Sequence, residues 1–575
     1  APLPPLIVAR QKPPPLEPKL PPLPVAPHHP LLVVLEKRAD VFLRSAADPI
    51  ARIGVAYTFL QLIIWRGDFH KARRIIAEIN PLLTAGPIPP ILLVLWRVTE
   101  GNYAWCTASH QLAEKKFREG LHITQKAGMP LLDCWLYGVS AYSALAAGDS
   151  RAAQVFLDKV EALNDLQRKH AISQVWFLRA GVALLQNDLT SALDHASNAM
   201  ELHEALGRPF AIASNRIGLA QILIEVGDVE KARFHLEKAI HYARTMNSSL
   251  LEHQSLLVEA YSWIKQGEEH KALTPLREGL RIARENDYLI LDLWWRPHVM
   301  VRLFSQALQS EIEVVYVKSV IRRRNITPES PDVEIWPWPI KVYTLGRFEL
   351  LCDDKPLRSA GKSQHKPLEL LQCLCAFGGQ AVHQDRVTDA LWPDADGDAA
   401  AQALRTTLHR LRKLLQHEQA VRLEDRQLSL DPGYIWVDCY AFERAVIQAE
   451  TADRVSLQRA MSQYKGHFLQ GDPVPWALAF RERLRAHYIS LAERLGVALE
   501  QNGDLTEAVD CYHRAFELEP VAETFCRRIM IIYARLGRRA EAVAIYQRFG
   551  QSLRSRLDMN PTQETQALYQ KLSKD

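Results

Sequence analysis

The chain has 575 residues, more than one hydrophobic core accommodates, so we expect three or four folding units. Its formal net charge of +4 confines any site for a polyanion to a local patch of the surface. No run of about 18 apolar residues occurs, so the sequence predicts no membrane span and no membrane partner. The eight cysteines form no CxxC pair, which argues against a disulfide framework or structural zinc and favours a reducing cytoplasm.

The first 30 residues hold 12 of the 33 prolines. Because proline removes a backbone donor and fixes φ, residues 1–30 are predicted to form a proline-rich, polyproline-like tail or linker. A ligand for a proline-reading partner is the alternative. His28 and His29 lie in this stretch without further ligand residues, so we predict no metal site there.

Residues 31–326 carry a repeated helical pattern in which a turn residue stands five positions before an alanine. Successive copies begin about 40 residues apart, as in helical repeat proteins. The pairs are Gly67 with Ala72, Gly148 with Ala153, Asn187 with Ala192, Gly227 with Ala232, Gly267 with Ala272, and a degenerate copy at Ala108 with Ala113.

Each copy predicts a helical hairpin, because Gly or Asn permits the turn and Ala lets the two helices cross closely. One hairpin cannot bury its own apolar face, so the copies should stack into an α-solenoid. The pattern resembles tetratricopeptide repeats. The array is similar to the sensor solenoid of the large ATP-binding LuxR-type regulators related to the maltose-operon activator. That resemblance implies an inducer or a regulatory protein as its partner.

Four aromatic residues of this region allow two interpretations. Tyr261, Trp263, Trp294 and Trp295 could line a concave ligand surface, or they could form core between repeats. We favour the second interpretation.

Residues 327–339 are rich in proline and predict a helix-free linker, where we place a domain boundary. Short strands are predicted at 340–346 and 347–352. Three helices are predicted next, one at about 364–377, a short one from Asp385 through Trp392, and a long one from Asp398 to about Gln416. Asp385 and Asp398 are the expected N-caps of the last two helices. Three strands follow at 421–423, 427–430 and 434–437. This order predicts a winged helix-turn-helix over 340–437.

The long helix is amphipathic. Leu404, Leu408, Leu411 and Leu415 form one apolar stripe that should pack on a core. Cationic and hydrogen-bonding side chains lie on its other faces. A solvated helix face is the simpler interpretation of an isolated helix, but the flanking elements favour a helix that reads DNA.

Several motifs carry a resemblance that covers about 341–572. LGRFEL (345–350), LELLQCLCAFGGQAV (368–382), DALWPD (389–394), ALRTTLHRLRKLL (403–415) and PGYIW (432–436) resemble the OmpR-type DNA-binding domain. They resemble more closely that of the streptomycete antibiotic regulatory proteins, which activate transcription. Residues 438–575 have two tetratricopeptide outlines, beginning at Gly503 and Gly537. This part is similar to the bacterial transcriptional activation domain that follows the winged helix in that family.

This resemblance implies double-stranded DNA and RNA polymerase as partners, with pairing of two copies, a homodimer, on direct repeats. Arg405, Thr406, His409, Arg410 and Lys413 should face the major groove, which admits one helix. Arg410 is our first choice for a base contact, since a guanidinium pairs bidentately with guanine and it aligns with a base-reading arginine of OmpR-type domains.

The other candidate DNA-binding residues have auxiliary roles. Arg405 and Thr406 are base or phosphate contacts one turn before Arg410. The remaining candidates are phosphate contacts or structural neighbours (Thr407, Arg412, Lys413), backbone-positioning residues (Lys366, Trp392) and wing residues for the minor groove (Arg422, Arg426).

No catalytic constellation is visible in the sequence. Gly361-Lys362-Ser363 resembles the end of a P-loop, but position 356 is Pro rather than Gly, so we expect no nucleotide site. We therefore predict no enzyme, no cofactor and no metal. The leading hypothesis is a cytoplasmic, bacterial, mainly α DNA-binding activator with a sensing solenoid. The alternative is a non-enzymatic interaction scaffold built on tetratricopeptide repeats.

Overall fold

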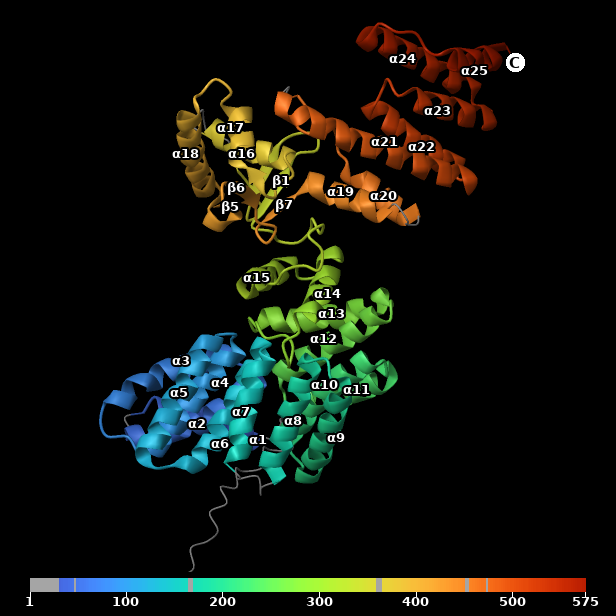
Figure 1. The fold of residues 1–575 in the computed structure, drawn as a ribbon. Coiled ribbons are helices and arrows are strands. Elements are labelled where there is room, and N and C mark those ends of the chain that lie inside the picture. Colours follow the sequence, from blue (N-terminus) through green and yellow to red (C-terminus); the bar gives the residue numbers. More distant parts are fainter. Residues whose placement is uncertain are drawn as a thin grey trace, which may run out of the picture. The chain divides into compact units, whose positions relative to one another are not determined.

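The computed structural model describes residues 30–574 with gaps at 46–47, 164–168, 358–363, 450–453 and 472–473 (Figure 1). The predicted tail up to residue 29, with its histidines, and Gly361-Lys362-Ser363 lie outside the described residues. The chain divides into two compact units, Ala1–Ile326 and Thr327–Asp575. In the part that the structure describes, no helix is both long and apolar enough to span a membrane.

The first unit is an array of antiparallel helix pairs. Its first elements are α1 (Pro30–Leu43), α2 (Pro49–Arg66), α3 (Phe69–Ile79), η1 (Asn80–Thr84), α4 (Pro90–Cys106), α5 (His110–Ala127), η2 (Pro130–Leu132), α6 (Asp133–Ala147) and α7 (Ser150–Ala162). They are followed by α8 (Lys169–Leu185), α9 (Leu189–Leu206), α10 (Pro209–Val226), α11 (Val229–Thr245), α12 (Ser249–Lys265), α13 (Glu269–Glu285), α14 (Pro297–Gln309) and α15 (Val314–Arg324).

The predicted hairpins and the α-solenoid are confirmed. The turn residues all have a positive φ: Gly67 (91°), Ala108 (59°), Gly148 (82°), Asn187 (62°), Gly227 (99°) and Gly267 (77°). The alanines five positions later are all fully buried: Ala72, Ala113, Ala153, Ala192, Ala232 and Ala272. A methyl group at these positions is small enough for the two helices of each pair to pack closely.

The aspartate that follows most turn residues is the N-cap of the second helix. Its carboxylate accepts the backbone N–H three residues later, at 3.0 Å for Asp68, 2.9 Å for Asp149 and 3.1 Å for Asp188. This hydrogen bond satisfies one of the free donors at a helix start. The repeated Gly-Asp or Asn-Asp pair therefore ends one helix and begins the next.

The second unit begins with an α+β part. Its elements are β1 (Ile340–Tyr343), β2 (Glu349–Cys352), β3 (Lys355–Pro356), α16 (His365–Ala376), β4 (Val382–His383), α17 (Gln384–Leu391), α18 (Gly397–Leu415), η4 (Glu418–Ala420), β5 (Val421–Glu424), β6 (Gln427–Leu430) and β7 (Ile435–Val437). One sheet has the order β3-β2-β1-β7, in which β1 pairs parallel with β7 through Ile340 and Ile435. The other, β4-β6-β5, is antiparallel and contains the wing hairpin β5–β6. This is the predicted winged helix-turn-helix.

Two predicted N-caps are wrong. Helix α18 begins at Gly397, and its N-cap is Asp396, whose carboxylate accepts the N–H of Ala399 at 2.8 Å. The N-cap of α17 is His383, which accepts the N–H of Asp385 at 3.4 Å. An N-cap needs an extended backbone to turn its side chain back onto the first turn. Asp398 and Asp385 already lie inside their first turns, where their charge favours the helix dipole.

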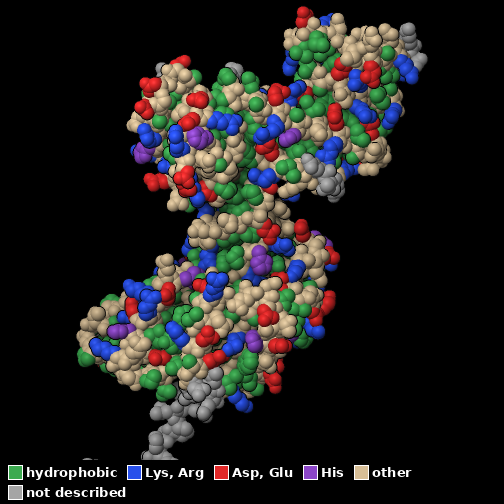
Figure 2. All heavy atoms as spheres, in the orientation of Figure 1, with side chains coloured by type: hydrophobic (Ala, Val, Ile, Leu, Met, Phe, Trp, Pro, Cys, Tyr) green, Lys and Arg blue, Asp and Glu red, His purple; other side chains and the backbone are tan. Residues whose placement is uncertain are grey.

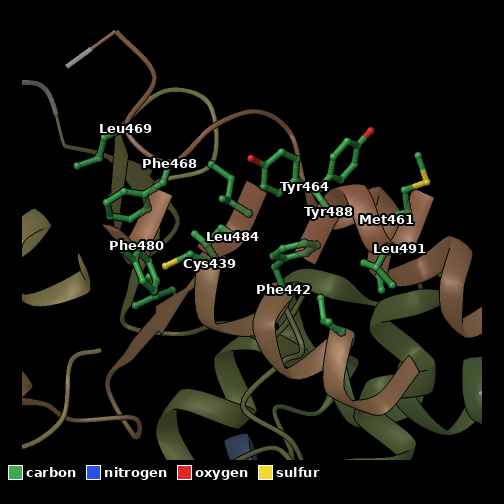
Figure 3. Close-up of a cluster of buried hydrophobic side chains, with 14 of the residues drawn as sticks. Cys439, Phe442, Met461, Tyr464, Phe468, Leu469, Phe480, Leu484, Tyr488 and Leu491 are labelled. Atoms are coloured by element: carbon green, nitrogen blue, oxygen red, sulfur yellow. The ribbon is translucent and has the colours of Figure 1, made fainter. Parts of the chain in front are cut away.

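The chain continues as helices: α19 (Asp438–Gln448), α20 (Arg454–Gln463), η6 (Pro475–Ala477), α21 (Leu478–Gln501), α22 (Leu505–Leu518), α23 (Glu523–Arg535), α24 (Arg539–Leu557) and α25 (Gln563–Lys574). The predicted repeat turns at Gly503 and Gly537 have φ of 83° and 73°. The side chains of α19 to α21 meet in an apolar cluster around Phe442, Tyr464 and Tyr488 (Figure 3). The same core continues into the winged helix, so the second unit has one core.

The proline-rich stretch 327–339 contains no helix. It lies on the second unit, because Asp332 forms an ion pair with Arg444 of α19. In addition, the Tyr343 hydroxyl donates to Glu334 at 3.0 Å. These contacts make the stretch part of the second unit rather than a free tether.

Candidate nucleic-acid interface

Helix α18 is fixed in the second unit by its apolar stripe. Leu404 and Leu408 are 2% and 3% exposed, and Leu411 and Leu415 are fully buried. The helix packs on α16 and α17. Burial of four leucines on one side fixes the rotation of the helix and therefore the direction of its other faces. The predicted docking of the stripe on the 364–377 helix is confirmed.

The opposite face of α18 is exposed and cationic. It carries five of the predicted DNA-binding residues, all exposed: Arg405, Thr406, His409, Arg410 and Lys413. Figure 2 shows Lys, Arg and His side chains gathered over this helix. The Thr406 hydroxyl donates to Gln402 O of the same helix at 3.0 Å. The structure therefore brings these five residues together on one surface.

The cations of this face have no carboxylate partner within the described part of the chain. Arg405, Arg410 and Lys413 can thus contact a phosphate without first breaking an ion pair, which makes such contacts favourable. The carboxylates of α18 and its loop lie at the other end, at Asp394, Asp396 and Asp398. Like charge there would repel a phosphate backbone, so the basic C-terminal half is the part suited to DNA.

Two other candidates on α18 face the protein. Thr407 is only 6% exposed. The Arg412 guanidinium donates through Nε to Val421 O at 2.9 Å, which ties the helix to the first strand of the wing. Of the two roles predicted for Thr407 and Arg412, this placement favours that of structural neighbour.

Lys366 and Trp392 lie together at the end of α17. The Lys366 ammonium donates to Leu391 O at 2.8 Å, pairs with Glu369 at 2.9 Å and lies 5.3 Å from the Trp392 ring. A cation at a helix C-terminus satisfies free carbonyls and interacts favourably with the dipole. Lys366 therefore holds the loop that leads into α18, and its charge is compensated by Glu369.

The two wing arginines are exposed but paired. Arg422 forms an ion pair with Asp431, and Arg426 forms one with Asp385 at 3.2 Å. The Arg426–Asp385 pair is exposed on both sides and contributes roughly 0–1 kcal/mol, so a phosphate can replace that carboxylate. Asp431 is only 11% exposed and also accepts the N–H of Gly433 at 2.8 Å, so it holds Arg422 more firmly. The wing could therefore contact DNA only by exchanging partners, unlike the face of α18.

The sequence did not predict a contact between the winged helix and the C-terminal helices that is centred on Asp438; we call this contact the joint. Asp438, the first residue of α19, is 7% exposed. Its carboxylate accepts the N–H groups of Thr344 and Leu345, each at 2.8 Å. The sequence signal was an acid directly after a buried strand, where a helix start favours a negative charge.

Two further contacts close the joint. The Tyr440 hydroxyl donates to Cys375 O at 2.9 Å, at the C-terminus of α16. The stretch after β1 pairs with the 467–470 loop through Leu469 N–H, which donates to Thr344 O at 2.8 Å. Helix α18 and the C-terminal helices are therefore parts of one compact unit.

In the described ranges no group of three or more His, Cys, Asp or Glu side chains could hold a metal ion. The four aromatic residues of the solenoid do not line an open surface. Tyr261, Trp294 and Trp295 are 2%, 1% and 6% exposed, and Trp263 is covered by the guanidinium of Arg233 at 3.4 Å.

Comparison with known proteins agrees with the C-terminal part. Residues 437–573 match the bacterial transcriptional activator domain. The regulatory protein AfsR of Streptomyces coelicolor is 30% identical over 254 residues, which cover 43% of this chain and 25% of AfsR. The regulatory protein AfsR of Streptomyces griseus is 27% identical over 225 residues, which cover 38% of this chain and 23% of that protein. The chain thus spans about a quarter of the length of the curated relatives it matches.

Among solved structures, Mycobacterium tuberculosis EmbR in complex with a low affinity phosphopeptide aligns with 41% of this chain and 65% of its own, at 18% identity and a TM-score of 0.32. The predicted resemblance to a bacterial transcriptional activation domain is confirmed, and with the two AfsR relatives it supports a role in the regulation of transcription. The resemblance of the solenoid to the maltose-activator sensor stays a prediction.

Proposed function

We propose that this chain is a sequence-specific DNA-binding activator of transcription that reads the major groove with α18. The observation that carries the proposal is the cationic face of this helix, whose charges lack carboxylate partners in the described structure. Arg410 makes the base contact, and Arg405 and Lys413 contact phosphates. Direct base readout by one arginine contributes about 1–3 kcal/mol of discrimination.

The C-terminal helices contact RNA polymerase, and the solenoid binds an inducer or a regulatory protein. Because the joint at Asp438 fixes α18 to these helices, the position of α18 on DNA also fixes the surface offered to polymerase. Two copies bind neighbouring direct repeats. The chain acts in the cytoplasm and has no enzymatic step of its own.

Fluorescence anisotropy with upstream fragments of the genome that encodes the chain tests this proposal. The two phosphate contacts of Arg405 and Lys413 predict a salt slope of about −1.8, so affinity should fall about 12-fold between 50 and 200 mM salt. The double variant Arg405→Ala/Arg410→Ala retains one contact, and its affinity should fall only about 3-fold over the same range. The fragment 327–575 is measured in parallel, because it lacks the solenoid, which could prevent DNA binding by the full chain when no inducer is bound.

The matched control is Arg459→Ala/Arg539→Ala, which removes the same charge at two exposed positions of α20 and α24. It should bind as the unmodified chain does. Equal loss in both double variants would show general charge attraction rather than a reading helix. Absence of salt-sensitive binding by the chain and by 327–575 would favour the protein-interaction scaffold.

A further inference from the structure

The segment between α13 and α14 is buried although it is not helical. We call residues 288–296 the inner segment. Its buried side chains are Tyr288, Leu289, Ile290, Leu291, Asp292, Trp294, Trp295 and Arg296, each less than a tenth exposed. Connecting segments normally run over the surface, where water satisfies their backbone. A buried connection of this length therefore has a specific position in the fold.

The inner segment lies along the face formed by the first helices of the hairpins. Its contacts are Tyr288 with Gly67 after α2, Trp295 with Leu145 of α6, Trp294 with Phe177 of α8, Asp292 with Gln221 of α10 and Ile290 with His253 of α12. The array also closes on itself, because the hydroxyls of Ser248 and Ser249 donate to Trp65 O and Arg66 O at 2.8 and 3.0 Å. The inner face is thus a channel, and the inner segment fills it.

The wall of the channel has a space that fits the indole ring of Trp294. Helices α8 and α10 have glycines, Gly181 and Gly218, where the Trp294 ring lies. A Cβ at either position would come within 2.6 Å of the Trp294 ring. Close packing leaves no room for a methyl group there, so the two glycines create the space that the indole occupies.

The channel also holds one acid and one base of the inner segment. Arg296 donates to Asp292 at 3.2 Å and to Glu225 of α10 at 3.0 Å. Three buried polar atoms have no hydrogen-bond partner among the described residues: Arg296 Nη2, Gln221 Oε1 and Trp294 Nε1. Buried polar atoms without partners are costly. Two of these atoms, Arg296 Nη2 and Trp294 Nε1, belong to the inner segment, whereas Gln221 Oε1 belongs to the channel wall, so the inner segment leaves one wall acceptor that a donor of an entering ligand could satisfy.

The inner segment is connected to the end of the first unit. The Trp295 ring lies 3.7 Å below the guanidinium of Arg324, the last residue of α15. Arg324 also contacts His110 at 2.9 Å, and the Tyr316 hydroxyl of α15 donates to Tyr288 O. Movement of the inner segment would thus release α15, the helix that precedes the second unit in the chain.

We propose that the inner face is a binding channel for an extended peptide, and that the inner segment is its resident, self-supplied ligand. The partner is a protein segment with the same chemistry, an acidic residue two positions before a pair of aromatic residues and then a base, as in Asp292-Leu293-Trp294-Trp295-Arg296. Its binding displaces the inner segment and frees α15. This deepens the sensing role proposed above and rests on it only for the consequence in transcription.

The test uses the full chain and a fluorescein-labelled synthetic peptide with the sequence of residues 286–297. Trp294→Ala in the chain empties the site between Gly181 and Gly218 while the channel keeps its walls. The variant should bind the peptide at least tenfold more tightly than the unmodified chain does. A peptide with alanine in place of that tryptophan should lose this gain. Trp263→Ala, which removes a half-buried tryptophan elsewhere, is the matched control and should show no gain.

Hydrogen exchange of the unmodified chain gives a second measurement, which decides the matter if Trp294→Ala does not fold. Excess peptide should accelerate exchange of the amides at 288–296 and at 322–326. The proposal would be overturned if exchange did not change and the folded Trp294→Ala chain did not bind the peptide. The inner segment would then be a permanent part of the hydrophobic core. Neither readout involves DNA, so failure of the DNA-binding proposal would leave this result intact.

Discussion

The carboxylate of Asp438 accepts two hydrogen bonds from Thr344, one from the backbone N–H at 2.8 Å and one from the hydroxyl at 2.6 Å. Asp438 begins α19, and Thr344 follows β1 of the winged helix. Leu345 N–H adds a third donor at 2.8 Å. A buried carboxylate surrounded by fixed donors permits one arrangement of the two elements. The winged helix and the C-terminal helices are therefore joined by a buried, hydrogen-bonded contact.

The free energy of unfolding of the second unit should fall as pH rises, because a buried carboxylate must ionise. Burial raises the pKa of Asp438 from 3.8 to about 6. Since the folded chain holds this proton more tightly, the contribution is fully present below pH 3.8 and is lost as pH rises through about 6. Between pH 5 and 7.5 the free energy of unfolding of 327–575 should fall by about 1.5 kcal/mol through this group. Urea unfolding at the two pH values measures it.

The variant Asp438→Asn should lack this pH dependence and be less stable at pH 5 by about 1–3 kcal/mol, because its amide N–H₂ would face N–H donors. Asp389→Asn, at an exposed position of α17, is the control and should keep the dependence. The same pH dependence in Asp438→Asn and in the unmodified chain would assign it to another group.

On α18, substitutions on the exposed face should change DNA affinity, and substitutions on the buried face should change stability. Arg410→Ala removes an exposed side chain, so it should weaken binding to a specific site by about 1–3 kcal/mol with little change in stability. Leu411→Ala, one residue later, removes a fully buried side chain and should cost about 2–5 kcal/mol of unfolding free energy. Anisotropy and thermal unfolding on the same preparations distinguish the two effects. Equal destabilisation by both variants would contradict the assigned rotation of the helix.

Patterns of short range were predictable from the sequence. The leucine stripe of α18 and the turn-to-alanine spacing of the solenoid depend on residues within two helical turns, and the structure confirms both. The N-cap of α18 could not be predicted to the residue, because Asp396 and Asp398 are equally suitable by residue type. Only the backbone before Gly397 decides between them.

Contacts between distant residues were not predictable. The Tyr288 hydroxyl donates to Gly67 O, 221 residues away in the sequence, and no periodic pattern in the sequence indicates this contact. Lys366 and Arg412 donate to main-chain carbonyls, which every residue possesses, so no sequence pattern identifies their partners. The wing arginines were expected to be available to DNA, but the pairs with Asp385 and Asp431 depend on the hairpin geometry.

The second unit should fold and bind DNA without the first, provided that 327–339 is kept. A fragment beginning at residue 340 loses the Asp332–Arg444 pair and the Glu334 acceptor of Tyr343. It also loses Trp336 and Trp338, which are 2% and 3% exposed, so the cost should be at least about 3 kcal/mol and the Tm should fall by about 6–12 °C relative to 327–575. Calorimetry of both fragments measures the difference. Equal Tm values would show that the stretch contributes nothing to the stability of the unit.

The shape of the channel predicts opposite effects for two glycine substitutions in the solenoid. In Gly218→Ala the added methyl would lie 2.6 Å from the Trp294 ring, so the variant should be destabilised by about 1–3 kcal/mol. In Gly138→Ala, on α6, the methyl meets no atom within 4 Å. Because alanine favours a helix, this variant should be more stable by up to about 1 kcal/mol. Urea unfolding of the full chain compares them, and a neutral Gly218→Ala would mean that the indole moves aside readily.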